Sequence, residues 1–153
     1  MRHKEIIEKR FVGLSIICFL FSMFLPAFTV YRPSMTKSIT FPGWYTFLVG
    51  SSSLILDFAQ SFVWLANIVY IIALWSMNKN EKLVFWLSVL LIIQALFFIS
   101  FETIKWTGSG RLDYLESLGF GYWLWLGSFL LLLSASIINR LRSNGYWHTD
   151  NTR

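Results

Sequence analysis

Long apolar runs alternate with short polar segments along this chain. Four of the runs approach the roughly 20 residues that an α-helix needs to cross a hydrocarbon core about 30 Å thick. The polar turn at 78–82 is so short that the second and third runs must lie antiparallel, as a helical hairpin. The pattern therefore predicts an all-α integral membrane protein, a four-helix bundle in which residues 1–153 form a single membrane domain. The expected spans are about 11–31, 58–77, 83–101 and 119–139.

The first connection between spans, Arg32–Asp57, contains an apolar stretch of its own. Gly43–Gly50 is too short to cross a membrane, so we expect a short helix that lies at the interface or re-enters the bilayer. Trp44 and Tyr45 then belong at headgroup level, because tryptophan and tyrosine gather at membrane–water boundaries. The same pattern also allows a second helix that begins near Trp44 and continues to Phe58 after a break.

The composition agrees with a membrane protein. Apolar residues make up 56% of the chain and aromatic residues 19%, whereas soluble domains use about 45–50% apolar residues. Four spans leave no room for a separate soluble catalytic or nucleic-acid-binding domain. The net charge of +5 does not indicate nucleic acid, because the basic residues are spread over both ends and the connections instead of following one face.

The distribution of lysine and arginine predicts which way the bundle faces. The two ends of the chain and the hairpin turn hold nine of these residues, and the two other connections hold four. Cytoplasmic loops of membrane proteins carry the excess of positive charge. We therefore expect the N- and C-termini on the cytoplasmic side and both long connections on the outer side.

Two amides lie level with each other in the predicted hairpin. Asn67 is 10 residues before Met77 and Gln94 is 11 residues after Leu83, so a rise of about 1.5 Å per residue places them at nearly one depth. We expect a hydrogen bond between them, worth on average about 0.6 kcal/mol between membrane helices. A structural role is favoured, and a place in the lining of a substrate path is the alternative.

Two carboxylates mark the outer ends of the same hairpin. Asp57 and Glu102 lie at similar depth, and Lys105 follows Glu102 within one turn. Such a pair could bind a cation, relay a proton or act in acid–base chemistry, because neighbouring carboxylates raise the pKa of one of them. The simpler interpretation is that both lie among headgroups and that Lys105 pairs with one of them.

Small residues mark faces for helix packing. Gly121, Ser128 and Ala135 recur every seven residues along the last span. They predict a close helix–helix contact, because lipid provides no hydrophobic driving force between helices and small side chains let two backbones approach. Ser15 and Ser22 mark a similar face of the first span, and the single cysteine excludes an intramolecular disulfide.

The segments Pro42–Trp44, Trp64–Asn67 and Gly119–Leu124 form a recognisable set of glycine, tryptophan and asparagine positions. Together they resemble segments of small four-pass bacterial inner-membrane proteins that are uncharacterised. The resemblance implies a location in a bacterial inner membrane. It implies nothing about a mechanism.

No catalytic, phosphate-binding or metal-binding motif stands out in this sequence. We predict a protein that is not an enzyme and that has no catalytic residues, cofactor or metal. Its expected partners are the lipid bilayer and a membrane protein that it contacts as a subunit, regulator or immunity-type protein, or else further copies of itself. The alternative is a small transporter or channel subunit that works as an oligomer, in which Asp57, Gln94 and Glu102 supply the polar groups.

Overall fold

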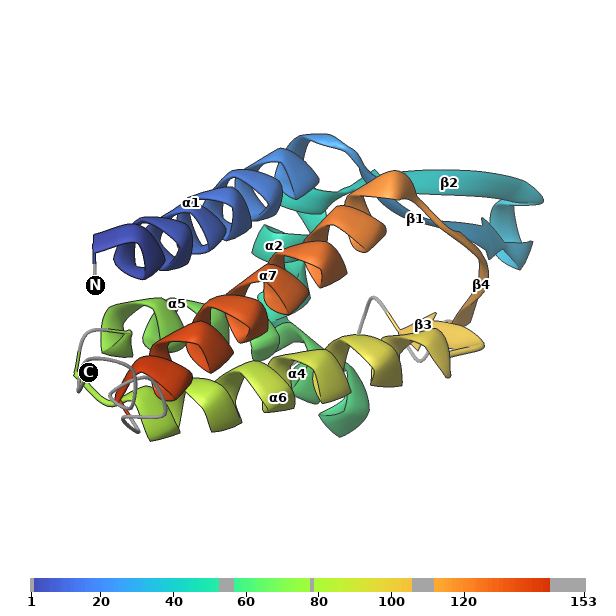
Figure 1. Ribbon diagram of the computed structural model, residues 1–153. Coiled ribbons are helices and arrows are strands. Elements are labelled where there is room, and N and C mark those ends of the chain that lie inside the picture. Colours follow the sequence, from blue (N-terminus) through green and yellow to red (C-terminus); the bar gives the residue numbers. More distant parts are fainter. Residues whose placement is uncertain (1, 53–56, 78, 106–111, 144–153) are drawn as a thin grey trace, which may run out of the picture.

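Helices lie side by side along most of the molecule, and a small β-sheet closes one end (Figure 1). The computed structural model describes residues 2–52, 57–77, 79–105 and 112–143. Its α-helices are α1 (Arg2–Phe24), α2 (Gly43–Val49), α4 (Phe58–Trp64), α5 (Ala66–Ser76), α6 (Glu81–Ile99) and α7 (Phe120–Ser143). Its strands are β1 (Pro26–Arg32), β2 (Lys37–Pro42), β3 (Thr103–Lys105) and β4 (Leu112–Leu118).

The sheet shows that the expectation of an all-α four-helix bundle is wrong. The four strands are antiparallel in the order β2-β1-β4-β3. β1 and β2 form a hairpin, whose connection ends at Thr36 with a left-handed φ of 50°. β4, which comes from the last connection before α7, pairs with the other side of β1. The two connections on one side of the bundle therefore fold together as one sheet.

The first apolar run does not form one helix over 11–31, because α1 ends at Phe24 and the chain continues as β1. Pro26 has no backbone N–H to donate and disfavours helical geometry in the residue before it. The residues that follow include Phe28, Val30 and Tyr31, which are aromatic or β-branched and suit a strand. The apolar character of residues 11–31 does not by itself distinguish a continuous helix from a helix followed by a strand.

The second apolar run is helical but interrupted. α4 ends at Trp64 and α5 begins at Ala66, with a break at Leu65. The stretch after Pro42 forms the short helix α2, which is separate from α4, since Asp57 caps the start of α4 in an extended conformation.

Three helical segments are long and apolar enough to cross a membrane: Phe58–Ser76, Glu81–Ile99 and Phe120–Leu141. Within the described part of the chain α1 is not among them, although four spans were expected. Its first turns carry charged residues, and its apolar part, Phe11–Phe24, is roughly 14 residues or ~21 Å long. α1 nevertheless lies along α7, and its start, the end of α7 and the α5–α6 turn share the end of the bundle opposite the sheet (Figure 1).

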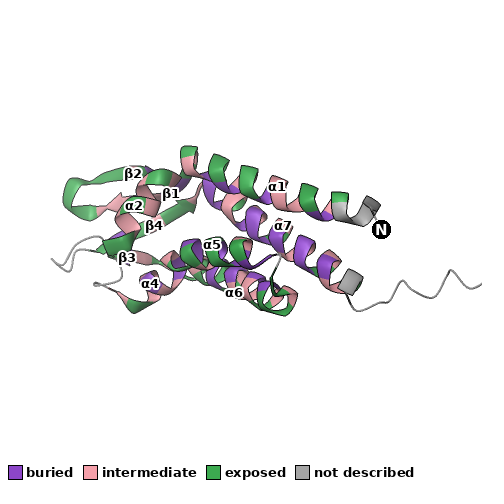
Figure 2. Ribbon diagram, turned by 90° about the vertical axis from the view of Figure 1, so that its left-hand side faces the viewer, coloured by how far each residue is buried: buried purple, intermediate pink, exposed green. Residues whose placement is uncertain are grey.

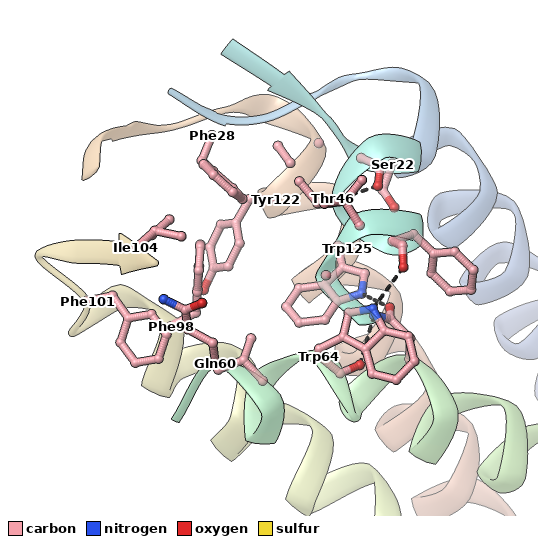
Figure 3. Close-up of a pocket in the computed structure, with 18 of the residues that line it drawn as sticks. Ser22, Phe28, Thr46, Gln60, Trp64, Phe98, Phe101, Ile104, Tyr122 and Trp125 are labelled. Carbon is pink, nitrogen blue, oxygen red and sulfur yellow. Dashed lines mark hydrogen bonds between the residues drawn. The ribbon is translucent and has the colours of Figure 1, made fainter. Parts of the chain in front are cut away.

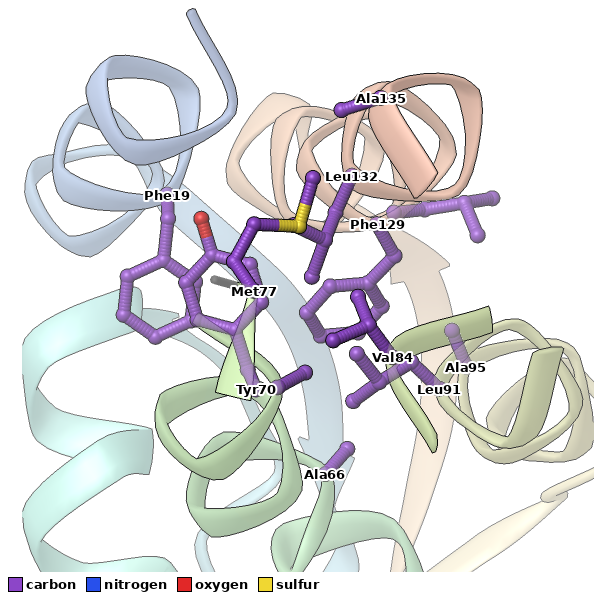
Figure 4. Close-up of a cluster of buried hydrophobic side chains, with 12 residues drawn as sticks. Phe19, Ala66, Tyr70, Met77, Val84, Leu91, Ala95, Phe129, Leu132 and Ala135 are labelled. Carbon is purple, nitrogen blue, oxygen red and sulfur yellow. The ribbon is translucent and has the colours of Figure 1, made fainter. Parts of the chain in front are cut away.

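The bundle has its own buried core, formed by α1, α5, α6 and α7 (Figure 4). Phe19 stacks on Tyr70 with ring centroids 4.5 Å apart, and Phe129 packs against the other side of this group. Outward-facing positions of the same helices are exposed (Figure 2). They include Trp75, Trp86 and Phe120, apolar side chains that suit a hydrocarbon environment. A second, smaller core lies under the sheet and contains Ala27, Phe28, Val30, Phe41 and Ile104.

Candidate functional site

The break between α4 and α5 is stabilised by the two amides that the sequence singled out. Gln94 on α6 donates from Nε2 to the carbonyl oxygen of Phe62, 2.7 Å away. Asn67 donates from Nδ2 to the carbonyl oxygen of Trp64, 3.0 Å away. A broken helix leaves backbone carbonyls without their usual partners, and polar side chains nearby can satisfy them. The two amides therefore stabilise one kink.

The expected hydrogen bond between Asn67 and Gln94 is not present. Asn67 Oδ1 accepts from Trp125 Nε1 on α7 at 3.1 Å. Gln94 Oε1 is buried and has no hydrogen-bond partner among the residues that the structure describes. Counting residues from the turn predicts only the depth of each amide, and the direction of a side chain around its helix axis is a separate variable.

At the sheet end of α4, Asp57 pairs with Lys105 and not with Glu102. Lys105 Nζ lies 2.8 Å from Asp57 Oδ2, and Asp57 Oδ1 accepts from the backbone N–H groups of Ala59 and Gln60. The ammonium group of Lys105 holds the pKa of Asp57 below its ordinary value. Glu102 is exposed. Lys105 thus pairs with one of the two carboxylates, as the simpler interpretation expected.

Gln60 attaches the start of α4 to strand β3. With its amide oriented to satisfy both groups, its oxygen accepts from the Lys105 N–H at 2.6 Å and its nitrogen donates to the Lys105 carbonyl oxygen at 2.9 Å. A side-chain amide thereby takes the place of a neighbouring strand at this position. The β3 edge is covered in this way, and sequence reasoning had not identified Gln60.

The small residues of α7 face α1. A Cβ atom added at Gly121 would lie 2.8 Å from the Leu25 carbonyl oxygen and 2.9 Å from that of Ser22, so only glycine fits here. Further along α7, the carbonyl oxygen of Ser128 accepts a hydrogen bond from Ser15 Oγ on α1 at 2.7 Å, and both serines are fully buried. Ala135 is also fully buried. The stripe lies inside the protein, against its own first helix.

A partly buried ion pair joins the two inner strands of the sheet, β1 and β4. Arg32 on β1 donates to Asp113 on β4, with Nε 3.0 Å and Nη2 2.8 Å from Oδ2. Asp113 is only 3% exposed. Its carboxylate raises the pKa of Arg32. The sequence did not predict this ion pair, because its two residues are 81 positions apart and only the pairing of β1 with β4 brings them together.

A cavity of about 140 Å³ lies where the bundle meets the sheet (Figure 3). We call it the aromatic cavity. Residues from α1, α2, α4, α5, α6, α7, β1 and β3 contribute to its walls. Its aromatic side chains are Phe28, Phe47, Trp64, Phe98, Phe101, Tyr122 and Trp125.

The walls of the aromatic cavity are held in place from several directions. The ring centroids of Phe28 and Phe98 are 5.4 Å apart, those of Phe98 and Tyr122 5.7 Å, and those of Tyr122 and Trp125 6.0 Å. Gly50 provides space for Trp64, because a Cβ at Gly50 would lie 2.5 Å from the indole Cδ1. These contacts hold the lining side chains around a space that is partly open to the surroundings of the protein.

No family model, curated protein or solved structure matches this chain. The segments Pro42–Trp44, Trp64–Asn67 and Gly119–Leu124, which were singled out from the sequence, meet in space, since each contributes to the wall of the aromatic cavity. Gly43 comes from the first segment, Trp64 and Asn67 from the second, and Gly121 and Tyr122 from the third. Glycine and tryptophan residues that are far apart in the sequence therefore line one cavity.

Proposed function

We propose that this chain is a multi-pass protein of a bacterial inner membrane that acts through contact with another membrane protein and is not an enzyme. The observation that carries the proposal is the use of its polar side chains. Asp57 caps α4 and pairs with Lys105, while Asn67 and Gln94 stabilise the kink before α5. A transporter or an enzyme would need such groups for substrate, whereas here their contacts are with the protein itself.

The proposed orientation places the sheet outside and the opposite end of the bundle in the cytoplasm. It is supported by the nine lysine and arginine residues in the two chain ends and the hairpin turn, against four in the connections that build the sheet. In this proposal the three apolar segments cross the bilayer, and α1, although its apolar part is shorter, crosses with them because it packs along α7. A reporter fused after Arg153 should be active only if it works in the cytoplasm, and activity of a periplasm-dependent reporter there would contradict this topology.

The outer edge of β2 is the surface that we propose for contact. β2 lies at one end of the strand order and pairs only with β1 among the described strands, whereas Gln60 covers the edge at β3. An open edge presents backbone N–H and C=O groups to which an extended segment of another protein can add as a further strand. Lys37, Ser38 and Thr40 on β2 are exposed.

Photo-crosslinking in native membranes tests this surface. A benzoylphenylalanine at Ser38, on the open edge, should give a crosslinked product of defined mass with another protein. The matched control is Ser117, an exposed serine on the inner strand β4, which should give much less product. Equal or absent products at both positions would contradict contact through β2. A product with the mass of two copies of this chain would favour the oligomeric transporter or channel subunit instead.

A further inference from the structure

We infer that the aromatic cavity is a binding site for the hydrocarbon chain of a membrane lipid. The cavity lies at the sheet-side ends of the three membrane-length segments, between α4, the end of α6 and the start of α7 (Figure 3). A chain from the surrounding bilayer is therefore the apolar molecule present at highest concentration beside it. This inference is independent of the proposed protein contact at β2.

The polar groups in the cavity wall select against a polar ligand, because they already bond within the protein. The indole N–H of Trp64 donates to the Phe47 carbonyl oxygen at 2.8 Å, and that of Trp125 donates to Asn67. The Tyr122 hydroxyl donates to the Ala95 carbonyl oxygen at 2.7 Å.

The smaller side chains of the wall follow the same rule. Thr46 donates to the Gly43 carbonyl oxygen at 2.8 Å, and Ser22 donates to that of Phe19 at 2.6 Å. Gln60 bonds to the backbone of Lys105. Because these groups have used their hydrogens within the protein and the exposed wall is mainly carbon, a ligand gains mostly contact with apolar and aromatic surface.

The size of the cavity limits what it can hold. At about 140 Å³ it is close to the roughly 150 Å³ of apolar protein cavities that stay dry and bind benzene or xenon. It therefore accommodates a few methylene groups of one chain and not a whole lipid. Lys105, the basic residue at the wall, is already paired with Asp57, so we expect little preference among lipid headgroups.

Photolabelling in lipid nanodiscs tests the site with the full chain. The probe is a phosphatidylcholine with a diazirine in one acyl chain, and the labelled residues are located by mass spectrometry. We expect label on cavity residues such as Phe98 and Trp64, in addition to label on outward-facing positions of the helices. Replacing the probe headgroup with phosphatidylglycerol should leave the cavity label unchanged.

Variants that fill the cavity make the test specific. Val63 lines the cavity, so Val63→Phe should reduce the cavity label several-fold while label at exposed Ile93 stays the same. Val89→Phe, on α6 and outside the cavity, is the matched control and should change neither signal. Thr46→Leu fills the cavity from α2 and serves if Val63→Phe fails to fold.

Three results would overturn the inference. The first is label confined to outward-facing residues in the unaltered protein. The second is cavity label that both filling variants leave unchanged. The third is cavity label from a diazirine on a free aromatic ring with none from the acyl-chain probe, because the site would then take a ring-shaped ligand instead of a lipid chain.

Discussion

The helical bundle and the sheet end of this protein are held together by different kinds of contact. In the bundle, small residues and single hydrogen bonds bring helices close, as where Ser15 joins Ser128 and the Tyr70 hydroxyl. At the sheet end, two ion pairs and a ladder of backbone hydrogen bonds connect distant parts of the chain. The bundle exposes large apolar side chains, while strand β2 exposes Lys37, Ser38 and Thr40.

The difference follows from the solvent that each region faces in the proposed orientation. Lipid provides no hydrophobic driving force between helices, so close packing and a few hydrogen bonds must hold them. Water can solvate the sheet end of the protein, so charged side chains and the unpaired edge of β2 are stable there. The aromatic cavity lies where the helical bundle meets the sheet, and both regions contribute to its walls.

The largest effect is expected where the two regions touch, at Gly121. Gly121→Ala places a carbon within 2.9 Å of backbone oxygens at the end of α1, which cannot rotate away. We expect a loss of about 3 kcal/mol of stability, the upper part of the usual range for overpacking. Thermal unfolding in detergent measures it.

Gly127 on the same helix is the control for that change. A Cβ there meets nothing within 4 Å, so Gly127→Ala should be neutral or stabilise by up to about 1 kcal/mol through higher helix propensity. If the two variants unfold at the same temperature, α1 and α7 do not pack through Gly121.

A slightly smaller effect is expected inside the sheet. Asp113→Ala leaves the Arg32 guanidinium without its partner and should cost about 2–3 kcal/mol, below the 3–5 of fully buried pairs because part of Arg32 still reaches water. The double variant Arg32→Met/Asp113→Leu should recover most of the loss. Equal destabilisation by the single and double variants would show that the charge pairing is not the cause.

Asp57 should show a moderate effect that depends on pH. Asp57→Asn keeps a cap for α4 and loses only the ion pair with Lys105, whereas Asp57→Ala loses both and should cost about 1 kcal/mol more. Lys105 lowers the pKa of Asp57 in the folded state, so this contribution is present above the ordinary value of 3.8 and is lost as the pH falls through the lower folded value. Unfolding measured from pH 7 down to acid should show a shallower decline for Asp57→Asn than for the unaltered protein.

The smallest effect concerns the kink in the bundle. A double-mutant cycle of Asn67→Leu with Trp125→Phe should give a coupling energy of about 0.6 kcal/mol, the average for hydrogen bonds between membrane helices. The cycle of Asn67→Leu with Gln94→Leu should give less, because these amides bond to different carbonyls. A larger coupling for the second pair would contradict the contacts at the kink.

The sequence by itself identified the apolar helical segments and the polar positions between them. Apolar runs of about 20 residues predicted α6 and α7 close to their observed ranges, whereas the first run ended in a strand and the second was interrupted. Counting residues along helices of fixed rise also predicts a similar depth for Asn67 and Gln94. These properties depend on neighbours in the sequence, which a window of residues contains.

Tertiary structure alone decided the sheet, the ion pairs and the aromatic cavity. β1 pairs with its hairpin partner β2 and also with β4, roughly 85 residues further on, and no local pattern specifies a partner at that distance. The same pairing brings Arg32 to Asp113. The cavity combines side chains of helices and strands, so its existence depends on how elements pack and not on any one of them. The sequence pattern located most of the helices, whereas contacts between distant residues decided where strands replace them and how the elements pack.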